Sequence, residues 1–136
     1  MSVASALLLA AMPVCAFAQG GHENPFLKPY PGKYGIPPFQ DITTADFLPA
    51  IKAGIAEQDQ NILNIVRNRA VPDFDNTIMP LENLSPILDR VAGVFYHYNE
   101  ALNTPDFAEM ADQAIPLLNE SRNKLYLNDQ LFQRIK

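Results

Sequence analysis

The stretch from Pro72 to Glu82, PDFDNTIMPLE, gathers three acidic residues, an asparagine and a threonine within eleven positions. As a calcium loop it would need glycine at its sixth position and a bidentate glutamate at its twelfth, but the chain has Ile78 and Leu84 there. The first, third and fifth ligands would be Asp73, Asp75 and Thr77. The pattern therefore favours helix capping, with carboxylates near the positive end of a helix. The candidate cap residues are Asp75, Asn76 and Thr77.

The dipeptide His22-Glu23 invites comparison with H-E-x-x-H, in which two histidines bind zinc and the glutamate activates water. Here Phe26 replaces the second histidine, and Pro25 interrupts the helix that the motif needs. We therefore expect a solvated dipeptide. The other histidine, His97, is placed by the pattern at the margin of an apolar helical stripe. A zinc site with three protein ligands is not expected in this chain.

Nucleophilic catalysis also lacks its usual sequence setting. After residue 18 the serines are Ser85 and Ser121, neither of them within G-x-S-x-G, and no glycine-rich phosphate loop occurs. Four acidic residues are spread along the first predicted helix and its entry as on a solvated face: Asp41, Asp46, Glu57 and Asp59. The sequence predicts no catalytic residue, no cofactor-binding residue and no metal ligand here.

Composition indicates a globular chain. Of its 136 residues, 48% are hydrophobic and 18% charged, which suits one domain or one piece of a larger protein. The net charge of −5 argues against nucleic acid or an anionic membrane surface as a partner, because both need clustered basic residues.

The first 18 residues predict a cleavable signal peptide. The apolar run Ala4–Ala11 is far shorter than the ~20 residues of a spanning helix, so no membrane span is expected. Ala16-Phe17-Ala18 fits the small-x-small rule, which places cleavage after Ala18, although no Lys or Arg precedes the run. A lipid anchor on Cys15 is an alternative, poorly matched by the residues before it. The expected location is periplasmic or secreted.

Residues 19–40 are interpreted as a Pro/Gly-rich extended arm. The segment from Gly20 to Gln40 holds five prolines and four glycines, which favour irregular, extended backbone. Its apolar side chains predict that the arm lies against a helical body. They are Phe26, Leu27, Tyr30, Tyr34, Ile36 and Phe39.

Residues 41–136 are predicted to be an all-α lobe of antiparallel helices. The first helix, about Ala45 to Asn68, follows an N-cap at Thr43 or Thr44 and carries Asp46 in its first turn. Its apolar residues recur at three- and four-residue steps. No stretch shows the sustained two-residue alternation of a strand, so no sheet is expected.

The remaining helices are predicted from capping signals. A second apolar stripe runs from Ile78 to Leu102, and Ser85-Pro86 within it either restarts the helix or kinks it. A third helix opens at Thr104-Pro105-Asp106, and Asn128 caps a last segment, Asp129 to Lys136. That segment has no Gly, Pro or polar tail after it, which indicates a truncated lobe.

Several short motifs follow one another in a characteristic order over Asn24 to Lys136. They are Asn24-Pro25-Phe26-Leu27, Pro37-Pro38-Phe39, Phe47-Leu48-Pro49-Ala50-Ile51 with Gly54, Phe74-Asp75-Asn76-Thr77-Ile78, Leu81-Glu82, Leu88-Asp89-Arg90-Val91 before Phe95, and Leu127-Asn128 before Leu131-Phe132 and Arg134-Ile135-Lys136. Together they resemble the N-terminal part of the thimet-oligopeptidase-like zinc metallopeptidases, with the bacterial peptidyl-dipeptidase branch nearest. The departures are Pro80 and Pro86, which would bend the second helix.

The resemblance implies a much longer, almost wholly helical enzyme whose two lobes enclose a channel for short peptides. It also implies that H-E-x-x-H and a downstream glutamate ligand lie in the C-terminal half, so that zinc is bound outside this chain. This chain would supply channel-wall scaffold, would require the missing catalytic part as its partner, and would be inactive alone.

The rival hypothesis is a free-standing periplasmic helical binding or inhibitor module. Such a module would bury its own apolar stripes. A part of a larger enzyme would leave apolar surface for segments outside the chain.

Overall fold

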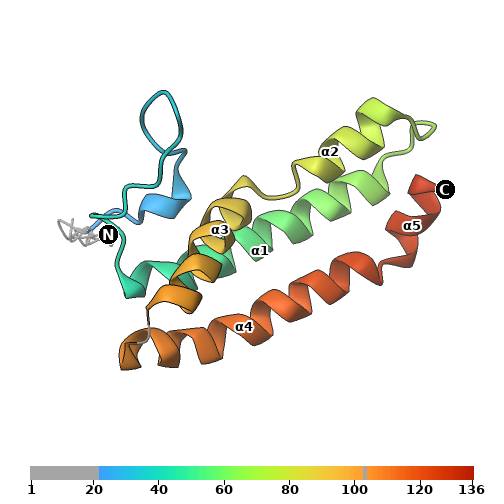
Figure 1. Cartoon of the computed structure of the whole chain (residues 1–136). Coiled ribbons are helices and arrows are strands. Elements are labelled where there is room, and N and C mark those ends of the chain that lie inside the picture. The colour runs from blue at the N-terminus through green and yellow to red at the C-terminus, as the bar shows by residue number, and fades with distance from the viewer. Residues whose placement is uncertain (1–21, 103) are drawn as a thin grey trace, which may run out of the picture.

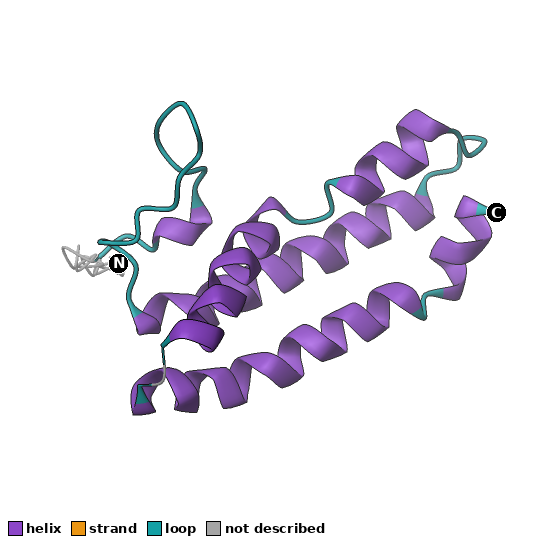
Figure 2. Cartoon of the chain, viewed as in Figure 1, coloured by secondary structure: helices purple, strands orange, loops and turns teal. Residues whose placement is uncertain are grey.

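The computed structural model describes residues 22–102 and 104–136; the expected signal peptide, with its cleavage site after Ala18 and with Cys15, lies outside the described residues. The helices are α1 (Thr44–Arg67), α2 (Met79–Glu82), α3 (Pro86–Ala101), α4 (Pro105–Tyr126) and α5 (Asp129–Ile135), joined by the short turns η1 (Pro25–Leu27) and η2 (Phe74–Ile78) (Figure 1). Residues 22–102 and 104–136 contain no strand (Figure 2), which confirms the predicted all-α class.

Helix α1 begins at the predicted capping signal. Thr43 is the N-cap residue, and one carboxylate oxygen of Asp46 accepts hydrogen bonds from its N–H and its Oγ–H, each at 2.7 Å. This arrangement gives the Thr43 N–H a hydrogen-bond acceptor. It also places the negative charge of Asp46 at the positive end of the helix dipole.

The stretch from Pro72 to Glu82 is a capped turn, but the cap residue differs from the prediction. Asp73 Oδ1 accepts from the Asn76 N–H at 2.8 Å, and Asn76 Oδ1 accepts in return from the Asp73 N–H at 3.2 Å. The expectation of a cap at Asp75, Asn76 or Thr77 is therefore wrong. A capping box needs a returning acceptor three residues after the cap, and Asn76 supplies it only for Asp73.

The Ser85-Pro86 pair restarts the chain as a new helix. Ser85 Oγ accepts from the Leu88 N–H at 3.0 Å, and Pro86 occupies the first helical position, where its missing N–H costs nothing. Thus α2 and α3 are separate helices and not one kinked helix. At the last predicted cap, Asn128 Oδ1 accepts from the Leu131 N–H at 2.9 Å.

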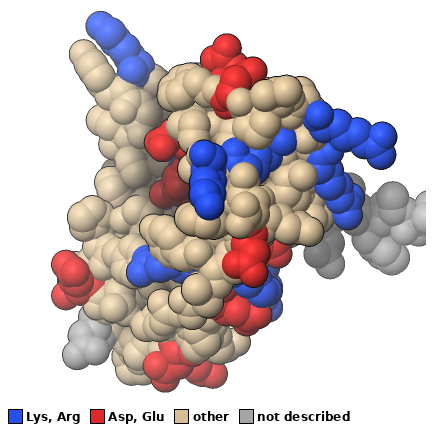
Figure 3. Space-filling view, turned by 90° about the vertical axis from the view of Figure 1, so that its right-hand side faces the viewer, with Lys and Arg blue, Asp and Glu red and all other residues tan. Residues whose placement is uncertain are grey.

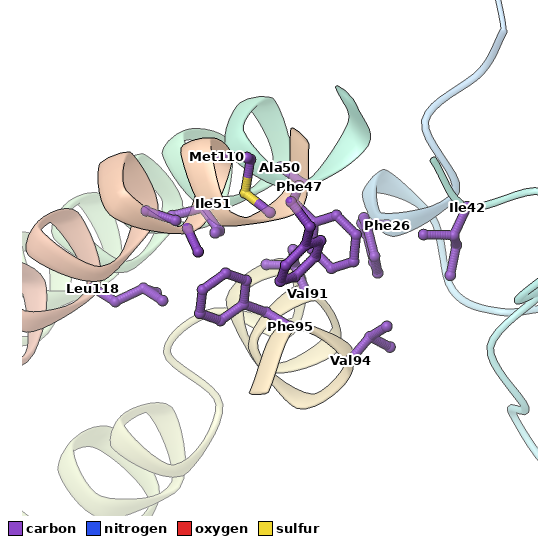
Figure 4. Close-up of a cluster of buried hydrophobic side chains, with 13 residues drawn as sticks. Phe26, Ile42, Phe47, Ala50, Ile51, Val91, Val94, Phe95, Met110 and Leu118 are labelled. Atoms are coloured by element: carbon purple, nitrogen blue, oxygen red, sulfur yellow. The ribbon is translucent and has the colours of Figure 1, made fainter. Parts of the chain in front are cut away.

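Successive long helices run antiparallel to each other, and α3 and α4 both lie against α1. In Figure 1, α3 runs back beside α1 and α4 then returns along it, and α1 packs against both. The ring of Phe47 lies at the centre of the main core (Figure 4), with ring centroids of Phe26 at 5.0 Å, Phe107 at 5.4 Å, Tyr98 at 5.6 Å and Phe95 at 6.2 Å. Each buried aromatic ring contributes about 2–3 kcal/mol through removal of apolar surface from water.

Gly54 sets the spacing between α1 and α3. A Cβ at this position would lie 2.7 Å from the backbone nitrogen of Leu88 and 2.8 Å from its Cα. Because those atoms belong to the first turn of α3, only glycine permits this closeness.

The arm lies against the helical body through part of its length. Phe26 is fully buried, its carbonyl accepts from Arg90 Nε at 3.0 Å, and Tyr30 is half-buried against the core. The prediction is wrong for three other side chains, which are exposed: Leu27, Tyr34 and Ile36. Phe39 is also half exposed, at 50%, although its ring stacks on Tyr98 with centroids 6.2 Å apart.

A glycine turn explains why the arm leaves the body. Gly32 and Gly35 both have positive φ, at 96° and 58°, a conformation that favours glycine. The chain therefore loops outward between η1 and α1 (Figure 1). Of the described helices, none is both long enough and apolar enough to cross a bilayer.

Candidate functional site

His22 joins the arm to the start of α1. Its Nε2 lies 2.9 Å from Asp46 Oδ1 and 2.8 Å from Oδ2, and Asn24 Nδ2 donates to the Asp46 carbonyl at 2.8 Å. Asp46 is only 4% exposed. The prediction of a solvated Asp46 is therefore wrong, whereas His22 and Glu23 are exposed as predicted, although His22 also bonds to Asp46. The cause is the capping box, which turns the Asp46 carboxylate back over Thr43 and towards the arm.

The surroundings of Asp46 keep it ionised. Burial raises the pKa of this carboxyl, but hydrogen bonds from the side chain and backbone of Thr43, together with the hydrogen bond and charge of His22, bring it below the ordinary value for aspartate. A carboxylate held by several donors is an acceptor and an anchor, whereas a general acid needs a raised pKa.

Glu57 and the two serines take part in contacts between helices. Ser85 Oγ donates to Glu57 Oε2 at 2.7 Å, and the Ile87 N–H donates to the same oxygen at 3.3 Å. Ser121 is buried and accepts from Gln58 Nε2 at 2.8 Å. Glu57 is thus half-buried and not fully solvated, since it holds the start of α3 against α1. Neither serine has a histidine partner among the described residues.

The other candidate side chains lie apart from one another. Asp41 and His97 are exposed, while Asp59 is half-buried between α1 and α4. Within residues 22–102 and 104–136, no group of three or more His, Cys, Asp or Glu side chains is placed to hold a metal ion. The described residues therefore do not fit a zinc ion, and no catalytic step is assigned to them.

One hollow of the described surface lies between α1 and α4. It has a volume of about 980 Å³ and combines aliphatic side chains with amides and charged groups. Lys124 Nζ lies 2.9 Å from Glu120 Oε1 on its α4 side, and that contact raises the pKa of Lys124. The lining residues are Asp59, Ile62, Leu63, Pro116, Asn119, Glu120, Asn123, Lys124, Leu127 and Asn128.

A second hollow, which we call the end groove, lies between α2, the end of α4 and α5. Its volume is about 410 Å³, and a single charged residue, Glu82, is among its lining residues. Several of its side chains are largely exposed, with Tyr126 at 78%, Phe132 at 60% and Ile135 at 46%. The end groove is lined by Leu81, Glu82, Leu125, Tyr126, Asn128, Leu131, Phe132 and Ile135.

Arg134 fixes α5 beside this groove. Its Nη1 donates to the Asn68 carbonyl at 2.6 Å, and its Nη2 donates to Asn76 Oδ1 at 2.9 Å, with longer contacts of 3.4 Å to the Ala70 carbonyl. Its Nε is buried without a hydrogen-bond partner among the described residues. The sequence could not predict this contact. Its acceptors are two backbone carbonyls and one side-chain amide, 58 to 66 residues before Arg134, and no local pattern links them to that arginine.

Taken together, these features define an all-helical scaffold with a buried aromatic core and open grooves between its helices. Over 112 residues the chain is 34% identical to the dipeptidyl carboxypeptidase of Escherichia coli, a match that covers 82% of this chain and 16% of the relative. The corresponding protein of Salmonella typhimurium is also 34% identical, over 113 residues, and oligopeptidase A of E. coli is 29% identical over 97 residues, or 71% of this chain and 14% of the relative. No protein-family model matches the chain.

The chain therefore belongs to the thimet-oligopeptidase-like zinc metallopeptidases, as the resemblance predicted. It spans about one sixth of the length of the relatives that it matches.

Proposed function

We propose that this chain is the non-catalytic N-terminal part of an exported zinc peptidase of the peptidyl-dipeptidase or oligopeptidase type. The observation that carries the proposal is the 34% identity to a dipeptidyl carboxypeptidase over 82% of the chain. The substrates of the complete enzyme would be short peptides. Its chemistry would use water activated by zinc and polarised by a glutamate, with all of these groups outside this chain.

The role proposed for the chain itself is scaffold. Helices α1, α3 and α4 share one core, and the arm is attached to it through Phe26 and through the contact between His22 and Asp46. A wall built from packed helices suits a peptide channel, because it holds its shape while a flexible substrate threads past.

The decisive test is to sequence the gene beyond the Lys136 codon. We expect the reading frame to continue into a region that encodes H-E-x-x-H. A stop codon directly after Lys136 would refute the proposed role as part of a peptidase.

A second test concerns activity. We expect the purified chain to cleave no oligopeptide, with or without added zinc. Zinc-dependent cleavage that a chelator abolishes would show that the catalytic groups lie in this chain after all.

Export is tested by the N-terminus of the protein recovered from its native cells. We expect the chain to begin at Gln19 in the periplasm or the medium, while intact mass distinguishes a form that keeps a lipid on Cys15. An uncleaved N-terminus in the cytoplasm contradicts the proposed location.

The rival function is a free-standing helical binding or inhibitor module. The observation that favours it is the continuous core, to which the arm, α1, α3 and α4 all contribute buried residues. Such a module predicts a cooperative thermal transition and no binding of dyes that report apolar surface. Strong dye binding by the folded chain argues for the scaffold function instead.

A further inference from the structure

The end groove is one apolar part of the described surface that the neighbouring helices leave uncovered. Tyr126, Phe132 and Ile135 are 78%, 60% and 46% exposed although they lie around one hollow. Below them, Leu131 is 3% exposed and packs with Ile62, Ile65 and Leu84 in a second buried cluster. The groove is therefore an open continuation of that cluster.

The charges around the groove also point to an apolar occupant. Glu82 is the single charged residue in its lining. Figure 3 looks onto the end of the molecule that carries α2 and α5, and uncharged atoms form a broad surface there between scattered acidic and basic groups. The exposed side chains of Tyr126, Phe132 and Ile135 around the hollow are apolar surface of the kind that marks an interaction site in soluble proteins.

The relatives are much longer than this chain, and the part of them that the chain does not match indicates what occupies the groove. The match covers 16% of the length of dipeptidyl carboxypeptidase, so most of a protein of that size lies outside this chain. Helix α5, which carries Phe132 and Ile135, has seven residues and is attached through the Asn128 cap, Leu131 and Arg134. A helix this short has little stability of its own and gains it from packing.

We propose that the end groove is the docking surface for an apolar segment of the remaining, catalytic part of the same peptidase. This inference rests on the proposed function. The docked segment contacts the exposed side chains of Tyr126, Phe132 and Ile135. Its apolar side chains enter the hollow of about 410 Å³. The docked segment completes the cluster around Leu131 and fixes α5.

Thiol labelling tests the proposal with two matched positions. Tyr126 and Tyr34 are both 78% exposed, but Tyr34 lies between Gly32 and Gly35 on the outward loop of the arm and does not line the groove. Tyr126→Cys and Tyr34→Cys are prepared separately, in this chain and in the complete protein from the same gene. Labelling is read by peptide mass spectrometry, so that the native Cys15, the single cysteine of this sequence, is resolved from the new thiol.

We expect Tyr126→Cys to react at least about tenfold more slowly in the complete protein than in this chain, while Tyr34→Cys reacts at nearly the same rate in both. Equal rates at position 126 overturn the proposal. A labelling rate at position 126 that falls as the concentration of this chain rises also overturns it, since a second copy is then the occupant.

Hydrogen exchange of the unsubstituted proteins gives the same comparison without a new cysteine. Amides of α5 are expected to exchange more slowly in the complete protein, and unchanged exchange contradicts the docking. A complete protein with zinc-dependent peptidase activity and an open groove refutes the docking surface alone. A gene without H-E-x-x-H after Lys136 refutes both.

Discussion

The substitution Gly54→Ala tests the closest approach between two helices of the core. The added Cβ would lie 2.7 Å from the Leu88 nitrogen, 0.7 Å short of the 3.4 Å at which ordinary contact begins (3.4 − 2.7 = 0.7). The obstructing atoms are backbone, and the Leu88 N–H is also held by Ser85 Oγ at 3.0 Å. The first turn of α3 therefore cannot shift without loss of its cap.

The magnitude follows from two opposing effects. Overpacking against fixed atoms costs up to about 3 kcal/mol, and replacing glycine by alanine inside a helix returns about 1 kcal/mol. We expect Gly54→Ala to lower the free energy of unfolding by about 2 kcal/mol, which corresponds to a fall in Tm of roughly 6–10 °C for a chain of this size.

Gly93→Ala is the matched control. Gly93 is exposed within α3, and a Cβ there meets nothing within 4 Å. Because no steric overlap opposes the higher helix propensity of alanine, this variant should be about 1 kcal/mol more stable than the wild type. Thermal and urea unfolding followed by far-UV circular dichroism measure both variants. If Gly54→Ala is as stable as Gly93→Ala, the close packing of α1 on α3 is wrong.

Three further predictions concern the core and its polar contacts. Because hydrogen bonds hold the pKa of Asp46 below its ordinary value despite burial, the unfolded state binds more protons on acidification. Its contribution is present above about pH 4 and is lost as pH falls through the lower, folded pKa. Asp46→Asn should reduce the loss of unfolding free energy on acidification, measured by urea titrations at several pH values. An unchanged dependence on pH counts against the contact. Ser121→Ala leaves the Gln58 amide buried without its partner and should cost about 1–3 kcal/mol in urea unfolding; a neutral effect means that the contact is absent. Phe47→Ala should cost about 3–5 kcal/mol, whereas Phe74→Ala, at a position 61% exposed, should change stability by less than about 0.5 kcal/mol; similar thermal shifts for both would contradict the placement of the core.

Local patterns in the sequence were sufficient to predict the long helices. The apolar periodicity and the capping residues at Thr43, Thr104 and Asn128 act over a few residues, so α1, α4 and α5 begin where the sequence predicts. The same signals could not decide between a kink and a restart at Ser85-Pro86. That outcome depends on Glu57, 28 residues away, which accepts from the Ser85 hydroxyl.

The candidate site depended on contacts between distant segments and was mostly missed. An aspartate in the first turn of a helix usually faces water, so spacing alone could not place Asp46 under His22. The arm was predicted to lie against the helical body through its apolar side chains, but the positive φ values at Gly32 and Gly35 turn part of it outward. The end groove could not be predicted either, because its side chains share a surface only after α2, α4 and α5 have taken their relative positions.

The contact between Arg134 and the loop after α1 has a consequence for the order in which the chain folds. It joins Arg134 to Asn68 across 66 residues, and closing so long a segment costs on the order of 4 kcal/mol of chain entropy. A nascent polypeptide cannot make this contact until Arg134 has left the ribosome, by which time all of α1, α3 and α4 have been synthesised. The loop between Asn68 and Asn76 therefore becomes ordered late, and a protease that removes α5 would release that loop as well.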